Sequence, residues 1–511
     1  MIRPARSPLE SPRPRRVDGW TARNGPLLAI LLSVAPGTLL AAAVTGVSEL
    51  PPQGATATVC DARAARAKVR AASLEHVAVL LKTGFGTIGF AALDSTQLPA
   101  YTYRSSRYDA RVGPIWFVMH GAERNAQRYL RAAAPIAERY AALAVAIEFS
   151  KENYPTSGDY TLGVIERGRV GEFAFSEGRW RDPDQYLYGE VERVFDAVRR
   201  SLSGCQAGYY LFGHSAGAQF VHRLITFEPN PRVLGAVAAN AGWYTLPTWG
   251  NGTRFAIPYA LRGSPLTMRD LEHVLAAPLV VLLGSEDTAT PAVDNLLRGT
   301  PEAMAQGANR FERGKRYFTM GQASARAHNL QLGWRLAEAP GAAHQMTEVI
   351  ASAGFLLFDS SEQPCRAESS VGATSLSFAR ILVDPPRGKR GDANNDGVRD
   401  AAADEYVELV NTGPKPACLA GWTLHDATNR RRHLFPLGHA LAPGKRLMIF
   451  GGGIPMGEFA GAEVQWASSA RGLSLTNRGD VVTLRDSAGR VVRRVSWGDC
   501  GGVACASEHR S

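Results

Sequence analysis

Apolar residues follow two different patterns along the chain, and the change from one to the other comes near residue 360. Between residues 60 and 358, short apolar runs alternate with stretches in which apolar residues recur at helical spacing. This alternation predicts a mostly parallel sheet with helices on both faces. We expect strands at 115–119, 143–149, 209–212, 234–239, 279–283 and 334–339, and helices at 126–142, 188–202, 218–225 and 346–353.

The second pattern begins at about residue 376, where helical periodicity disappears. Short β-rich runs recur there between turns of Gly, Asn and Pro, which is typical of a small β-sandwich. The intervening segment is rich in Ser, Glu, Pro and Gly and is interpreted as a linker. The pattern therefore predicts an α/β section at 60–358, a linker at 359–375 and an all-β section at 376–505.

The N-terminal segment differs from both sections. Several Arg residues precede an apolar run at 26–47, which is broken at Pro36 and contains small residues at 41–43. A basic start, an apolar run and small residues are typical of a secretory signal peptide. Since the run also approaches the roughly 20 residues that span a bilayer, we expect 1–47 to be a signal peptide or an N-terminal anchor. Both interpretations predict a secreted or extracytoplasmic protein.

Composition narrows the choice of partners. The chain is 45% hydrophobic and 20% charged, which is typical of folded domains. Its net charge is +10, but the basic residues are scattered and form no stripe with aromatics, so we expect no nucleic-acid partner. The six Cys residues form no CxxC pair and no zinc-like cluster with His. An even number of cysteines in an exported chain predicts disulfides, whose pairing the sequence does not resolve.

A GxSxG box at 213–217 is the main candidate for chemistry. It directly follows an apolar strand and precedes a helical stretch. A serine hydroxyl is a weak nucleophile unless it is exposed, positioned and placed beside a base. The sharp strand-to-helix turn supplies the exposure, and small flanking residues permit the turn. We therefore expect Ser215 to be a nucleophile and the backbone N–H of Ala216 to be an oxyanion donor.

The matching base and acid are expected later in the chain. Among eleven histidines, His344 stands in a loop of small residues between the strand at 334–339 and a helix. Asp287 follows the strand at 279–283 and can hold an imidazole in the correct tautomer. Asp294 is the alternative acid, and Asp287 could instead cap a turn or helix.

The turn after the strand at 115–119 is a second oxyanion candidate. Gly121 and Ala122 could offer a backbone N–H there, because glycine lets such groups turn toward a carbonyl. The alternative is an ordinary β–α turn. Substrate contacts are expected from His120, His214, Trp243 and Tyr244, although buried aromatics more often belong to the core.

Together these residues resemble the α/β-hydrolase superfamily, and within it the esterases related to poly(3-hydroxybutyrate) depolymerases and feruloyl esterases. The resemblance covers 60–358 and rests on His120-Gly121, Asn125-Ala126, the box at 213–217, Asp287 and His344. It implies an α/β-hydrolase fold and a secreted serine hydrolase that cleaves carboxylic esters through an acyl-serine intermediate, with no cofactor. Its substrate would be a small ester or a polymer, with polyesters or aromatic esters as candidates.

The second section resembles the lamin-tail domain, an immunoglobulin-like sandwich appended to many exported enzymes. The matching runs are 404–411, 419–424, 441–444 and 473–497. The resemblance implies a binding or anchoring role without catalytic residues, such as contact with a cell surface or a polymer.

An acidic loop at 392–400 resembles a calcium loop, with oxygen ligands at alternating positions and a glycine for the turn. It departs from the pattern at Ala403, where a carboxylate would be expected. A solvated acidic turn is therefore the alternative to a structural Ca²⁺ site. The expected ligands are Asp392, Asn394, Asp396, Val398 and Asp400.

Two rival functions remain open at this stage. One is a secreted serine peptidase or acyltransferase on the same fold, which substrate profiling would separate from an esterase. The other is a non-catalytic cell-surface binding protein in which the sandwich does the work. Replacing Ser215 would leave that second activity intact.

Overall fold

A computed structural model describes residues 81–166, 179–249, 256–359, 375–500 and 503–510. The segment expected to be a signal peptide or anchor, 1–47, lies outside these residues, as does nearly all of the expected linker. No helix in the described part of the chain combines the length and the apolarity that crossing a bilayer requires.

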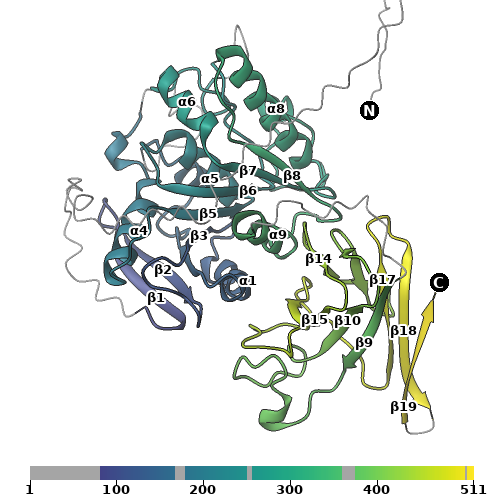
Figure 1. Ribbon diagram of the computed structural model, residues 1–511. Helices are drawn as coiled ribbons and strands as arrows, with labels where there is room; N and C mark the ends of the chain where they lie inside the picture. The colour runs from purple at the N-terminus through teal and green to yellow at the C-terminus, as the bar shows by residue number, and fades with distance from the viewer. Residues whose placement is uncertain (1–80, 167–178, 250–255, 360–374, 501–502, 511) are drawn as a thin grey trace, which may run out of the picture. The chain divides into compact units, whose positions relative to one another are not determined.

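An eight-stranded sheet forms the centre of the α/β section, with the strand order β1-β2-β4-β3-β5-β6-β7-β8 (Figure 1). The strands from β4 to β8 in this order run parallel, whereas β2 pairs antiparallel with both β1 and β4. The strands are β1 (Gly84–Ala91), β2 (Gln97–Arg104), β3 (Ile115–Met119), β4 (Leu143–Ile147), β5 (Tyr209–His214), β6 (Val233–Ala239), β7 (Leu279–Gly284) and β8 (Arg335–Ala339).

Both faces of this sheet are buried. Successive side chains of a strand point to opposite faces, so Trp116 and Val118 of β3 belong to the core cluster that includes α1 and α9, while Phe117 belongs to the cluster on the other face, which includes α4, α5 and α8. This two-sided burial explains why the strands are apolar throughout. The helices are α1 (Ala126–Arg139), α2 (Ser157–Thr161), α4 (Gly189–Ser201), α5 (Ala216–Phe227), α6 (Met268–Ala276), α7 (Pro301–Met304), α8 (Arg310–His328) and α9 (Met346–Phe358).

The predicted α/β fold class is confirmed. The elements that the expected ranges do not include are the hairpin of β1 and β2 and the helices α2, α6, α7 and α8. The antiparallel hairpin of β1 and β2 buries only alternate residues of β1, so it has no continuous apolar run. Helix α8 was missed because it is rich in charged residues and contains Gly314 and Gly321. Both glycines allow close packing: a Cβ would lie 2.2 Å from Leu283 at Gly314 and 2.7 Å from Trp334 at Gly321.

The second section is a β-sandwich, as expected. Its two main sheets have the orders β16-β15-β10-β9 and β13-β12-β17-β18-β19, and β11 pairs with β14. The core lies between the sheets, where Leu409 and Ile449 meet Leu424 and Leu484. The strands are β9 (Leu376–Leu382), β10 (Tyr406–Asn411), β11 (Ala417–Cys418), β12 (Thr423–His425), β13 (Arg431–Leu434), β14 (Ala440–Leu441), β15 (Arg446–Phe450), β16 (Glu463–Trp466), β17 (Gly479–Arg485), β18 (Val491–Cys500) and β19 (Val503–Arg510).

Candidate active site

Ser215 stands on a strained turn between β5 and α5. Its backbone has φ 59° and ψ −117°, a conformation that L-residues rarely adopt. The flanking glycines make the turn possible, because a Cβ on Gly217 would lie 2.2 Å from the Met119 carbonyl oxygen. A Cβ on Gly213 would lie equally close to the Gly217 carbonyl oxygen. The turn thus holds the serine side chain at the carboxyl end of the sheet.

Three predicted side chains meet at this edge of the sheet. The Oγ of Ser215 lies 3.1 Å from Nε2 of His344, and Nδ1 of His344 lies 2.6 Å from Oδ2 of Asp287. His344 follows β8 and Asp287 follows β7, so the ends of parallel strands bring together residues far apart in the sequence. An imidazole between a hydroxyl and a carboxylate can take up and return a proton.

Asp287 is fully buried, and its charge has a second partner. Nη1 of Arg310 lies 3.5 Å from its Oδ1 and 2.7 Å from Oδ2 of Asp294. Burial alone would raise the pKa of Asp294, but the hydrogen bonds from Arg310 and the Leu296 N–H, together with the charge of Arg310, hold that pKa below its usual value. Asp294, the alternative acid, is thus paired with Arg310, whereas Asp287 reaches the imidazole.

His214 packs directly against His344, with ring centroids 4.6 Å apart. Its Nδ1 lies 3.2 Å from the Tyr129 hydroxyl. Burial, followed by the nearby charges of His344 and Arg310, lowers the pKa of His214 well below its usual value. A neutral His214 adds no repulsion when His344 becomes positive, so it suits the inner wall of such a site.

The oxyanion candidates differ in their surroundings. Ala216 is the first residue of α5, so its backbone N–H belongs to the unpaired groups of a helix N-terminus. The backbone of Gly121 hydrogen-bonds the hydroxyl of Tyr129, whereas Ala122 is exposed. These contacts favour Ala122 over Gly121 as the second donor.

Two predicted substrate contacts need correction. His120 and Tyr244 are fully buried. The His120 ring stacks on Tyr160 and accepts a hydrogen bond from the Phe149 backbone N–H at 3.1 Å. Tyr244 stacks on Tyr317. Since neither side chain reaches solvent, both support the loops around the site and do not present a surface to substrate.

Trp243 is also almost fully buried, and it is enclosed by cations. The guanidinium of Arg223 lies 4.0 Å from its ring centroid and that of Arg298 lies 4.6 Å away. Such cation–π contacts stabilise the loop after β6. Trp243 therefore has a structural environment, and its predicted contact with substrate remains a prediction.

The predicted calcium ligands lie in one loop of the sandwich, where their oxygens accept backbone N–H groups. Oδ2 of Asp392 accepts from Gly397, Oδ1 of Asp396 from Val398, and Oδ1 of Asn394 from Asp396. Asp400 accepts from Ala402 and Ala403. In the part of the chain that the structure describes, no group of three or more His, Cys, Asp or Glu residues could hold a metal ion. The calcium site stays a prediction.

Sequence reasoning missed the residues that support the candidate site. Arg310 is almost completely buried beside Asp287. Asn240, which has a positive φ, accepts from the Gly284 N–H and donates to the Ala343 carbonyl, so it ties together the two loops that carry Asp287 and His344. An Asn directly after a buried strand was the available signal for Asn240, whereas nothing in the sequence distinguishes Arg310 from a surface arginine.

Comparison with solved structures finds proteins similar to the α/β section. Poly(aspartic acid) hydrolase-1 from Sphingomonas sp. KT-1 is 35% identical with a TM-score of 0.50, over 55% of this chain and 100% of that chain. A poly(3-hydroxybutyrate) depolymerase from Bordetella parapertussis is 33% identical with a TM-score of 0.49, over 55% of this chain and 92% of that chain. No curated protein matches.

The second section matches the family model of the lamin tail domain over residues 373–499. Both resemblances noted in the sequence are thus confirmed. The chain belongs to the esterase-type α/β hydrolases, and it carries a lamin tail domain in its C-terminal section.

Proposed function

We propose that this α/β hydrolase is an exported serine hydrolase that cleaves carboxylic esters through an acyl-serine intermediate. In this proposal Ser215 is the nucleophile and His344 is the general base. Asp287 is the carboxylate that orients the imidazole of His344. The observation that carries the proposal is the unbroken chain of contacts from the Ser215 hydroxyl through His344 to Asp287.

The reaction follows from these contacts. Oγ of Ser215 attacks the ester carbonyl carbon while its proton passes to Nε2 of His344. The tetrahedral intermediate then expels the alcohol, which takes the proton from His344. Water then attacks the acyl-serine carbonyl and gives a proton to the same nitrogen. The second tetrahedral intermediate expels Oγ of Ser215, which takes that proton back from His344, and the carboxylic acid is released. Asp287 stabilises the imidazolium in both steps.

Backbone donors would stabilise the oxyanion of each tetrahedral intermediate. The N–H of Ala216 and that of Ala122, or of Gly121, are the proposed donors. Loss of one such donor costs on the order of 3 kcal/mol of transition-state stabilisation in serine hydrolases.

The test is covalent labelling together with turnover. A fluorophosphonate should label the wild-type chain at Ser215, and Ser215→Ala should lower kcat on p-nitrophenyl esters by about 10⁴-fold or more. Ser201→Ala changes an exposed serine at the end of α4 and should leave both readouts unchanged. A folded wild-type chain that is neither labelled nor active on any ester would refute the proposal.

The acyl group is proposed to belong to a polymer. The two similar structures are named as hydrolases of poly(aspartic acid) and poly(3-hydroxybutyrate). The first name favours a second candidate function, cleavage of amide bonds in an anionic polymer, which a net charge of +10 would help to attract. Assays on both polymers beside p-nitrophenyl esters distinguish the candidates, since only an amidase would release aspartate oligomers.

Export is part of the same proposal. The thiols of Cys205 and Cys418 are not free, which supports an oxidising compartment. We further propose that the lamin tail domain contacts a cell surface or a polymer, and that a structural Ca²⁺ could bind its loop at 392–400. Fractionation of the producing cells, polymer pull-down and calorimetric titration with Ca²⁺ test these points separately.

A further inference from the structure

One side chain of the lamin tail domain reaches both loops of the candidate active site. Arg431, at the start of β13, donates from Nη1 to the carbonyl oxygen of Gly341 at 2.5 Å. The same nitrogen lies 3.4 Å from Oε2 of Glu286. Gly341 belongs to the loop that ends in His344, and Glu286 precedes Asp287. A single guanidinium from the sandwich thus contacts both loops that carry the proposed base and acid.

Glu348 extends this contact toward His344. Nη2 of Arg431 lies 2.5 Å from Oε1 of Glu348, while Oε2 of Glu348 accepts the backbone N–H of Ala343 at 2.8 Å. The carboxylate is about nine-tenths buried, with an exposed fraction of 10%. A buried, charge-assisted bridge of this kind is stronger and better defined than a surface ion pair. It links Arg431 to the residue next to His344.

The rest of the loop is fixed by the α/β section. Ser285 accepts the N–H of Gly341, the N–H of Glu286 reaches the carbonyl of Ala342, and Asn240 reaches that of Ala343. Gly341 itself has a φ of 73°, so its peptide groups need these partners to keep one orientation. Unlike these groups, the carbonyl oxygen of Gly341 accepts its hydrogen bond from the sandwich, through Arg431.

Packing continues the contact along α9, the helix that follows His344. Gly421 has no room for a side chain, because a Cβ there would lie 2.6 Å from Cβ of Pro340. Leu434 joins the apolar cluster of α9, and the N–H of Leu437 donates to Oγ of Ser352 at 3.0 Å.

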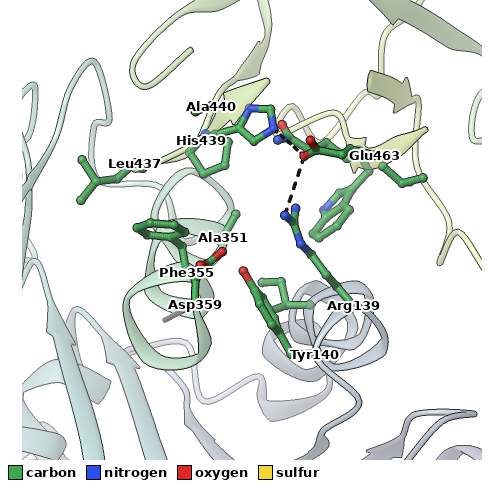
Figure 2. A pocket seen from close by; sticks show the side chains of 15 residues that line it. Arg139, Tyr140, Ala351, Phe355, Asp359, Leu437, His439, Ala440 and Glu463 are labelled. Carbon is green, nitrogen blue, oxygen red and sulfur yellow. Dashed lines mark hydrogen bonds and ion pairs between the residues drawn. The ribbon is translucent and has the colours of Figure 1, made fainter. Parts of the chain in front are cut away.

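Figure 2 shows the same interface further along α9. A pocket of about 380 Å³ opens there, and both Arg139 of α1 and His439 of the sandwich reach Glu463. The contact around Arg431 is thus one end of an extended interface, so Arg431 is held on a packed surface and not on a free loop.

We propose that Arg431 of the lamin tail domain is a positioning residue for His344. This inference rests on the proposed serine-hydrolase function. Arg431 fixes the Gly341 carbonyl and, through Glu348, the Ala343 N–H, and so sets the distance from His344 to Ser215. A base displaced by about 1 Å can lose on the order of 10²-fold in rate. The lamin tail domain is therefore a structural part of the catalytic unit.

The experiment compares variants of the full chain on a p-nitrophenyl ester. Arg431→Ala should lower kcat about 10- to 100-fold with KM changed less than about threefold. Arg431→Lys, which keeps one cationic donor, should recover part of the loss. Arg430→Ala is the matched control, since Arg430 is the exposed neighbour, and it should behave as wild type.

A double-mutant cycle tests the route through Glu348. Glu348→Gln should lower kcat, and the double variant Arg431→Ala/Glu348→Gln should be no slower than the slower single variant, because both changes break one bridge. Wild-type kcat in Arg431→Ala would overturn the inference. If that variant fails to fold, wild-type kcat in both Arg431→Lys and Glu348→Gln overturns it equally. A wild-type chain without esterase activity or fluorophosphonate labelling would instead refute the proposed function.

Discussion

The two sections of the chain each bury an aspartate, and the two carboxylates have different partners. Asp287 contacts side chains, namely the imidazole of His344 and the guanidinium of Arg310. Asp404, in the sandwich, accepts the backbone N–H groups of Ala393, Asn394 and Asp400. Backbone amides do not exchange protons during a reaction, whereas an imidazole does. The partners of a buried carboxylate, and not its burial, therefore separate a candidate catalytic residue from a loop organiser.

The strongest test of this comparison is Asp287→Asn. The amide keeps the size of the side chain but can neither stabilise an imidazolium nor select the tautomer that a base needs, so kcat should fall about 10³- to 10⁴-fold. The melting temperature should change little in comparison. Ester turnover and circular dichroism measure both. Asp294→Asn is the control, because it removes only the neighbouring partner of Arg310. It should lower kcat about tenfold or less. Equal losses in the two variants would mean that Arg310, and not His344, gives Asp287 its role.

Asp404→Ala should show the opposite profile. Three backbone N–H groups would lose a charged acceptor at a buried position, so the unfolding free energy of the sandwich should fall by on the order of 3 kcal/mol. Calorimetry resolves this loss as an earlier transition. Asp400→Ala is the comparison, since Asp400 is exposed and accepts the backbone N–H groups of Ala402 and Ala403. It should lower the unfolding free energy of the sandwich by about 1 kcal/mol. A sandwich as stable as wild type in Asp404→Ala would show that the loop is organised by other contacts.

These two carboxylates also show what the sequence can predict. Ser215, Asp287 and His344 were identifiable because each follows a recognisable strand, and the carboxyl ends of parallel strands share one edge of the sheet. The calcium interpretation named alternating oxygens at 392–400, and this Ca²⁺ site stays a prediction. The carboxylate that binds backbone N–H groups of this loop is Asp404, which the interpretation did not include. Spacing alone does not tell whether an oxygen faces outward to an ion or inward to the backbone of its own loop.

Other features depend on tertiary placement and left no local signal. Arg310 and Arg431 resemble surface arginines in the sequence, and their partners lie in segments far away along the chain. Tyr244 follows a strand near the site, which made it a reasonable candidate for substrate contact. Its ring instead faces Tyr317 of α8, a helix that the apolar pattern did not indicate. Because the apolar pattern did not indicate α8, it could not show that the side chain of Tyr244 turns toward that helix.

Glu228, at the end of α5, is a third case that sharpens the comparison. Its Oε2 is buried, and no hydrogen-bond partner for it lies within the described residues. Burial, followed by repulsion from Glu192, raises the pKa of Glu228 to about 8 from 4.5. Because the folded-state pKa is raised, the stabilisation linked to this proton is fully present below pH 4.5 and is lost as the pH rises through about 8.

Glu228→Gln should therefore leave kcat unchanged and raise stability only at high pH. The amide stays neutral, so the variant should exceed wild type by on the order of 2 kcal/mol at pH 9 and by much less at pH 5. Melting temperatures of both proteins at the two pH values measure the difference. Glu272→Gln, on helix α6, is the exposed control and should show no such pH dependence. If the difference in melting temperature between wild type and Glu228→Gln is the same at both pH values, Glu228 is already ionised in the folded protein at pH 5. The fold would then tolerate this buried carboxylate without its taking up a proton.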